Sequence, residues 1–211
     1  MLRRAMKAKQ TGFTLIELMF TIVVLAVLLG IGVPNFRDFV RNSRMTSAAN
    51  DLLADLNLAR SEAVKRRVPV TLCKSTDGTS CSDTSDSTPF RRWIVFVDDA
   101  NPAAASTTND GNGAVETGET VLKDTSISGA IPTAVNTGRR VIYLPSGFPV
   151  SDATNGLSRV LFCDSRGTAI TAGGQTAARG VAVSATGRAV VSRDKAKIEA
   201  STGGGGFGGC P

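Results

Sequence analysis

The chain has 211 residues, of which 42% are hydrophobic and 20% are charged, a composition typical of a globular domain. It contains no histidine, which excludes Ser-His-Asp and Cys-His catalysis and every histidine-ligated metal site. The formal net charge of +6 lies towards the front: four basic residues precede Gly12, whereas residues 68–211 carry 13 basic and 13 acidic ones. This placement favours contact with a membrane surface over contact with nucleic acid.

Residues 13–33 form an apolar run in which Glu17 is the only ionisable residue. As a helix these 21 residues would be about 32 Å long, enough to cross a bilayer. A secretory signal peptide also has a basic head and an apolar stretch, but it is cut after that stretch at small residues. Here the run ends in "GVPNFRDF", which offers no such site, while Gly12 precedes the run. A cut after Gly12 would remove the basic head, residues 1–12, and leave the apolar helix on the mature protein.

Glu17 is costly within this run, because a carboxylate at the centre of a membrane helix costs on the order of 2.5–3.5 kcal/mol and somewhat less near the helix end. Three explanations stay open on physical grounds. The free amine on Phe13 of a neighbouring subunit could pair with the carboxylate. Alternatively, the side chain could reach the bilayer surface, or the charge could be tolerated near the helix end.

The stretch "TGFTLIELMFTIVVLAVLLGIGVPNF" resembles the N-terminus of type IV pilins and type II secretion pseudopilins. The resemblance covers the basic leader, Gly12, Phe13, Glu17, the apolar helix and Pro34. It implies that a prepilin peptidase cuts between Gly12 and Phe13, that Phe13 is N-methylated, and that an inner-membrane assembly platform builds the subunit into a filament. In this family the glutamate is thought to neutralise the amine of an adjacent subunit, which favours the first explanation for Glu17.

Residues 35–67 are amphipathic and predict one helix that runs from about Phe13 to Arg66. The predicted apolar face consists of Ala49, Leu52, Leu53, Leu56, Ala59, Ala63 and Val64. The opposite, polar face consists mostly of Arg41, Arg44, Asp51, Asp55, Arg60 and Glu62. Gly30, Gly32 and Pro34 predict a local bend or melt, because glycine and proline cost roughly 1 and 3 kcal/mol in a helix interior.

Residues 68–211 predict a β-rich domain, in which short runs of branched and aromatic residues alternate with polar turns. The predicted strands are residues 68–74, 93–97, 140–145, 159–163, 179–184 and 187–192. The last two flank Ala185-Thr186 and predict a hairpin. The expected fold class is therefore α+β, with an antiparallel sheet packed on the second half of the long helix.

The stretches "AANDLLADLNLARSEAVKRR", "FCDSRG" and "SATGRAVVSR" are similar to FimT/FimU-type minor pilins and GspH-type pseudopilins. The resemblance implies a type IV pilin-like fold and a low-abundance subunit that initiates a pilus or sits at its tip, beside other minor pilins and the major pilin. It also implies a single-pass inner-membrane protein with a periplasmic domain, which becomes part of a pilus on assembly. Two alternatives stay open: a type II secretion subunit in a periplasmic pseudopilus, and a DNA-binding minor pilin for natural transformation.

The four cysteines include no CxxC pair, which argues against redox catalysis and a zinc ribbon. An even number of separated cysteines in an exported chain indicates two disulfides. Three pairings are possible. We favour Cys73 with Cys81 and Cys163 with Cys210, because each pair closes a polar loop or holds a glycine-rich tail. Four buried free thiols are the alternative.

Residues 97–119 collect hard oxygen ligands of the kind that calcium prefers. These candidate ligands are Asp98, Asp110, Asn112, Glu116 and Glu119. The fragment at residues 110–113 is similar to part of a calcium-binding turn but lacks the full loop spacing. Because Asp, Asn and Gly are also ordinary turn residues, an acidic loop without metal is favoured over a calcium site.

Residues 139–211 carry nine basic and four acidic residues, whereas residues 68–138 carry four and nine. FimT-type minor pilins of some bacteria bind DNA through a GRxR motif, and the matching place here, residues 187–190, reads GRAV and lacks the second arginine. The candidate DNA contacts are Arg179, Arg188, Arg193 and Lys195. Dispersed cations without stacking aromatics are weak DNA sites, so docking between oppositely charged subunits, or a merely solvated surface, is favoured.

An enzymatic function is the least favoured interpretation. The sequence contains no phosphate-binding glycine loop and no nucleophile–base pair. Asp98 and Asp99 are adjacent, so they would point to opposite faces of a strand and could not act together. The sequence therefore predicts a structural subunit with no cofactor.

Overall fold

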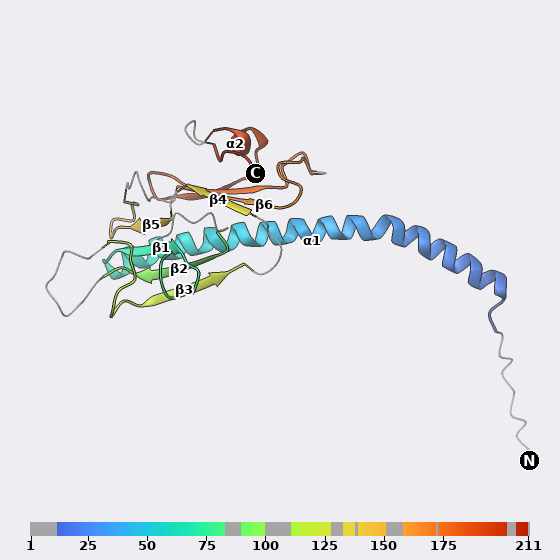
Figure 1. Cartoon of the computed structure of the whole chain (residues 1–211), viewed down its shortest axis with the longest axis horizontal. Helices are drawn as coiled ribbons and strands as arrows, with labels where there is room; N and C mark the ends of the chain where they lie inside the picture. The colour runs from blue at the N-terminus through green and yellow to red at the C-terminus, as the bar shows by residue number, and fades with distance from the viewer. Residues whose placement is uncertain are drawn as a thin grey trace, which may run out of the picture. The chain divides into compact units, whose positions relative to one another are not determined.

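The structure is a computed structural model that describes residues 12–82, 90–99, 111–127, 133–137, 139–150, 158–171, 173–201 and 206–210. The chain divides into two units, Met1–Arg41 and Asn42–Pro211. Helix α1, Leu15–Arg66, is 52 residues long and contributes residues to both units (Figure 1). It ends where the sequence predicts, and Arg67 then takes a φ of 62°, a left-handed conformation that commonly ends a helix.

In the first unit, α1 presents an apolar surface that no other described residue of the unit covers. Its large apolar side chains from Leu15 to Phe39 are between 40% and 78% exposed. The helix is long and apolar enough to cross a membrane by length and composition, with a mean hydropathy of 2.6 over its most apolar 18 residues. So large an exposed apolar surface is unfavourable in water, and the segment therefore requires lipid or other protein around it.

The middle of α1 is continuous. The described helix runs without interruption through Gly30, Gly32 and Pro34, so the local melt considered from the sequence does not occur in it. A proline inside a helix removes a single backbone donor, which affects one turn. Near that turn the side-chain amide of Asn35 donates to the Ile31 carbonyl at 3.0 Å and adds a hydrogen bond.

The second unit combines the rest of α1 with two antiparallel sheets, where the sequence predicts one. In the described residues eight strands pair in the orders β3-β2-β1-β5 and β4-β6-β7-β8 (Figure 1). Their bounds are β1 Val70–Lys74, β2 Arg92–Val97, β3 Val121–Ser126, β4 Thr133–Thr137, β5 Arg140–Tyr143, β6 Arg159–Cys163, β7 Arg179–Val183 and β8 Ala189–Ser192. All six predicted strands are confirmed. The sequence analysis does not predict three short elements: β3, β4 and helix α2, Lys195–Glu199. Their sequences are short and largely polar, so they show no clear apolar period.

The predicted hairpin of β7 and β8 is confirmed. The two strands pair antiparallel, with Val181 opposite Val191. The Ser184 backbone amide donates to the Arg188 carbonyl at 2.9 Å and closes the connection. Gly187 takes a φ of 78° there, a conformation that glycine adopts without the steric cost that a side chain would bring.

One hydrophobic core joins α1 to both sheets. The helix contributes mainly small and aliphatic residues, among them Met45, Leu52 and Leu56, all at most 1% exposed. The first sheet adds Trp93 and neighbours, and the second sheet adds Phe162 and neighbours. The strand residues of this core are Val70, Leu72, Trp93, Val95, Val141, Tyr143, Val160, Phe162 and Val181. The helix face predicted from the sequence is thus the face that packs, although Val64 at its edge is half exposed.

The structure contradicts the placement of Asp55 on the polar face of α1. Asp55 is fully buried, at 0% exposure. Its carboxylate accepts hydrogen bonds from Trp93 Nε1 at 2.8 Å and Thr125 Oγ1 at 2.7 Å. It also forms an ion pair with Lys123, whose Nζ atom lies 2.5 Å from Asp55 Oδ1. Two of these donors lie on β3, the strand that the sequence pattern does not reveal. A buried charge is stable only with such partners, so the network ties α1 to the first sheet.

The end of the chain covers the second sheet on the side away from α1's core. A second, smaller apolar cluster contains Leu161, Ala178, Ile198 and Phe207. The tail is held on α2 by backbone hydrogen bonds from Phe207 to Lys197 and from Gly209 to Ile198. Phe207 fits directly over Gly180 of β7, because a Cβ atom on Gly180 would lie 2.5 Å from Phe207 Cζ.

Gly180→Ala is therefore expected to displace the tail. Forcing a methyl group into a filled site costs typically about 1–3 kcal/mol, so exchange of the Phe207 and Gly209 amides should speed up by about tenfold. Hydrogen exchange measured by mass spectrometry on the full chain in detergent provides the test. Gly173→Ala is the matched control, since a Cβ there meets nothing within 4 Å. Equal exchange in both variants would contradict the proposed fit.

Candidate functional site

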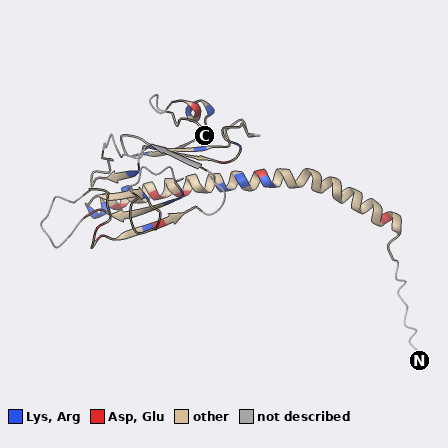
Figure 2. Cartoon of the chain, in the orientation of Figure 1, with Lys and Arg blue, Asp and Glu red and all other residues tan. Residues whose placement is uncertain are grey.

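The candidate residues of the N-terminal segment are exposed. Gly12 and Phe13 precede α1, and Phe13 is 83% exposed. Glu17 lies in the first turn of the helix. Figure 2 shows that most of the N-terminal half of α1 is free of charged residues, and in the sequence the next charged residue after Glu17 is Arg37. In the described residues no basic side chain pairs with Glu17.

Thr14 and Glu17 cap the start of α1 reciprocally. The Glu17 backbone amide donates to Thr14 Oγ1 at 3.3 Å, and the Thr14 backbone amide donates to Glu17 Oε2 at 3.5 Å. This is a capping box, and its Thr-x-x-Glu signal is readable in the sequence. Thr14 is thus a functional candidate that the sequence analysis missed. The capping contact is long and weak in this geometry, so the carboxylate remains free to take a stronger, charged partner.

Both disulfides of the structure join the cysteine pairs favoured from the sequence. Cys73 of β1 pairs with Cys81, with Cα atoms 5.6 Å apart, and ties the loop after β1 to the first sheet. Cys163 of β6 pairs with Cys210, with Cα atoms 5.9 Å apart, and ties the tail to the second sheet. The second bond closes a loop of 47 residues and thereby limits the freedom of the glycine-rich tail.

The calcium candidates do not converge on one point in the described residues. Asp98 turns inwards, where its Oδ2 atom accepts from Thr71 Oγ1 at 2.5 Å and from the Gly113 amide at 2.9 Å. The Asn112 side chain instead bonds Glu116 at 3.2 Å and the Ala114 amide at 2.6 Å. No group of three or more acidic or cysteine residues within the described residues is arranged to hold a metal ion. Asp110 lies outside those residues.

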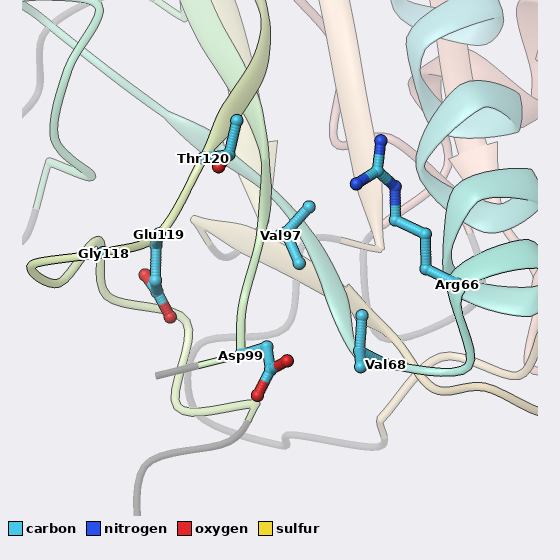
Figure 3. Close-up of a pocket in the computed structure, with 7 residues that line it drawn as sticks. All are labelled: Arg66, Val68, Val97, Asp99, Gly118, Glu119 and Thr120. Carbon is cyan, nitrogen blue, oxygen red and sulfur yellow. The ribbon is translucent and has the colours of Figure 1, made fainter. Parts of the chain in front are cut away.

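An open pocket lies beside the same segment. It is lined by Arg66, Val68, Val97, Asp99, Gly118, Glu119 and Thr120 (Figure 3). Glu119 is the unusual group in it, because burial, with help from nearby carboxylates, raises its pKa to about 7. Its neighbour Asp98 also has a raised pKa, with burial as the main cause. Both carboxyl groups are therefore protonated more readily than an exposed carboxyl group.

The prediction of Arg179 as a DNA contact is wrong, because its side chain is buried. It is 2% exposed, and its Nη1 atom donates to the carbonyl oxygens of Thr176, Ala177 and Ala178 at 2.8, 2.8 and 3.1 Å. Burial, reinforced by nearby arginines, lowers its pKa to about 10. Arg179 therefore holds the loop before β7 in place and cannot reach a phosphate backbone.

The other three candidates do not lie together, because they are found at opposite ends of β8. Arg188 is exposed in the β7–β8 turn, before β8 begins. Arg193 and Lys195 follow the opposite end of β8, and Lys195 lies near Glu199, with Nζ to Oε1 at 3.7 Å. Because the four residues of β8 separate the two groups by more than about 13 Å, a compact basic groove is absent among them. Their contact with DNA stays a prediction.

Comparison with known proteins identifies the family. Residues 48–187 match the family described as Type II transport protein GspH. The chain belongs to this family. Residues 7–33 of this GspH-family protein match the Prokaryotic N-terminal methylation motif, which includes Gly12, Phe13 and Glu17. The α+β fold with a long N-terminal helix and antiparallel sheets is confirmed, and the protein is a type IV pilin-like protein.

Several known pilins are similar to this GspH-family protein. The fimbrial protein EcpC of Eikenella corrodens is 44% identical over 45 residues, which are 21% of this chain and 29% of that protein. The type IV major alpha-pilin of Moraxella bovis is 31% identical over 81 residues, 36% of this chain and 51% of that protein. The chain thus spans about a third and about half of the length of these two relatives. The crystal structure of the Pseudomonas aeruginosa type IV minor pilin FimU matches with a TM-score of 0.45 and 18% identity, over 73% of this chain and 92% of that chain.

Proposed function

We propose that this GspH-family protein is a minor pilin, a structural subunit of a type IV pilus that helps to initiate assembly or forms part of the tip complex. Adhesion, twitching motility or DNA uptake would be the processes that the pilus supports. The observation that carries the proposal is the exposed apolar helix with one acidic residue in its first turn, directly after Gly12 and Phe13. Such a helix requires a bilayer before assembly and other helices after it.

The proposed steps of assembly are those that the resemblance of this segment to type IV pilins implies. Cleavage by a prepilin peptidase after Gly12 removes the basic leader and creates a free amine on Phe13, which is then N-methylated. The Glu17 carboxylate of one subunit meets the amine of its neighbour, and in an apolar surrounding this pairing is strong. The assembly platform of the inner membrane lifts the subunit into the filament, where other minor pilins and the major pilin surround its helix. The β-rich domain, in the periplasm before assembly, then lies at the surface of the pilus.

The second candidate is a pseudopilin of a type II secretion system, which the family description favours. The same N-terminal chemistry serves both machines, so the N-terminal segment does not discriminate between them. A direct role in DNA uptake has less support, because one of its four candidate contacts is buried.

Deletion of the gene, with and without complementation by the full chain, tests the proposal. The expected result is a loss of surface pili in electron micrographs, restored by complementation, with unchanged levels of secreted enzymes in the culture fluid. Normal pili with a loss of secretion would favour the pseudopilin. Normal pili and normal secretion together would contradict both. Crosslinking in intact cells would then identify the neighbouring subunits.

A further inference from the structure

The second sheet has an apolar outer face, which the end of the chain covers. Side chains alternate along β6, so Phe162 points into the main core while Leu161 and Cys163 lie on the opposite, outer face. Gly180 of β7 is paired with Leu161 and shares that face, directly below Phe207. Figure 1 shows α2 on the far side of β6 from α1. Leu161 is fully buried there, so its cover is part of the folded domain.

The cover consists of α2 and of a strap, residues 206–210. Ile198 of α2 and Phe207 of the strap belong to one small apolar cluster with Leu161. The last carbonyl groups of a helix have no partner within the helix, and the strap supplies partners for them. Its backbone amides donate to carbonyl oxygens at the end of α2: Phe207 to Lys197 at 3.1 Å, Gly208 to Ala200 at 2.8 Å and Gly209 to Ile198 at 2.8 Å. Because α2 has only five residues, it is too short to be stable without such support.

The strap is weakly held apart from its covalent link. Residues 203–206, 208 and 209 are all glycine, the residue type that loses the most conformational freedom on folding. Phe207 is the only large apolar side chain of the strap. The disulfide between Cys163 and Cys210 fixes the strap to β6 only three residues after Phe207, and it thereby keeps the ring close to its site.

We propose that the strap is a redox-controlled cap on the second sheet. The Cys163–Cys210 disulfide holds it closed, and reduction of this bond opens it while both sheets stay folded. Opening releases the strap amides, leaves the last carbonyl groups of α2 without partners, and uncovers the apolar face at Leu161. The end of α2 and the strap therefore open together.

The opening reaction is a thiol–disulfide exchange with a dithiol. Cys210 is half-buried whereas Cys163 is 1% exposed, so a thiolate of the dithiol attacks the Cys210 sulfur and Cys163 leaves as a thiolate. The second thiolate of the dithiol then attacks the mixed disulfide and releases Cys210. Two electrons and two protons pass to the protein, which gains two thiols, and the dithiol becomes an internal disulfide. Closing is the reverse reaction with an oxidant that carries a disulfide.

Hydrogen exchange of the full chain in detergent, measured by mass spectrometry before and after dithiothreitol treatment, tests the cap. Alkylation identifies the dose at which Cys163 and Cys210 are reduced. The expected result is exchange at least about tenfold faster in peptides that cover residues 197–200 and 206–210. Exchange in β6 and β7 and the fluorescence of Trp93 should stay unchanged. Unchanged exchange in the strap would overturn the proposal, and so would sheet amides that exchange as fast as the strap.

Cysteine variants assign the effect to one disulfide. The double variant Cys163→Ala/Cys210→Ala should show fast strap exchange without reductant, and dithiothreitol should not increase it further. The matched control Cys73→Ala/Cys81→Ala removes the other disulfide, which belongs to the first sheet, and its strap exchange should be as slow as in the parent. Equal strap exchange in the two double variants would overturn the assignment to Cys163 and Cys210. If the first variant does not fold, reduction of the parent chain decides the question by itself.

Discussion

Replacing Asp55 with alanine is expected to lower the free energy of unfolding by about 3 kcal/mol. The substitution removes the acceptor of the indole N–H of Trp93, a side chain that is fully buried. It also releases Thr125, and it leaves a small void at the centre of the contact between α1 and the first sheet. Lys123 contributes less to the loss, because its side chain is 45% exposed and its ammonium can turn to solvent.

The same contact provides the measurement. Trp93 is the only tryptophan of the chain, so its fluorescence reports the environment of the Asp55 carboxylate directly. Urea unfolding of the full chain in detergent, followed at Trp93, gives the change in free energy. Asp51→Ala is the matched control: the same residue type, one turn earlier on the same helix and exposed, with an expected effect within about 0.5 kcal/mol. A loss below about 1 kcal/mol for Asp55→Ala would show that the network contributes little.

Glu17→Gln is expected to reduce incorporation of the protein into pili by about tenfold or more, which corresponds to roughly 1.4 kcal/mol of assembly free energy. The charge is the property removed. Glutamine can complete the capping box with Thr14 as glutamate does, so the start of α1 should form normally. An uncharged side chain cannot neutralise the amine of the next subunit, and an unpaired amine in an apolar filament core is costly.

Incorporation is measured as the fraction of the protein in sheared pili, with the membrane fraction as the reference. Mass determination of the membrane-bound protein must show that the leader has been removed after Gly12, because an uncut leader would also block assembly. Glu199→Gln, which keeps the N-terminal segment intact, should incorporate normally. Normal incorporation of Glu17→Gln, or a mature protein that retains its first twelve residues, would contradict the assembly role of this carboxylate.

Local patterns in the sequence predict much of the architecture. The apolar run and the amphipathic repeat predict α1 to within two residues at its start and to the residue at its end. Six strands follow from runs of branched and aromatic residues, because these runs are apolar enough to be recognised without their neighbours. The cysteine pairs favoured from loop closure are those of the structure. The Thr14–Glu17 cap is as local as these features, and its Thr-x-x-Glu spacing was available to find it.

Contacts between distant segments were not predictable in this way. Strand β3 carries Lys123, Asp124 and Thr125, which read as a polar loop until β2 pairs with them. Asp55 reads as a solvent-facing acid for the same reason, since its three donors lie 38 to 70 residues away in the chain. The sequence predicts Arg179 to be a surface cation, whereas in the structure its guanidinium is buried and donates to carbonyl oxygens of the loop directly before β7. The charge of a residue therefore does not show whether its side chain lies in solvent or is buried with hydrogen-bond partners.

The sequence by itself determined the membrane-length helix, the N-terminal methylation motif at its start, and the family, since each depends on neighbours within about one or two helical turns or on a contiguous motif. Only the tertiary structure decided that there are two sheets in the described residues, that Asp55 is buried, and that Glu119 is half-buried beside other acids. The physical reason is distance along the chain: burial and electrostatic potential are sums over residues that meet only when the chain has folded.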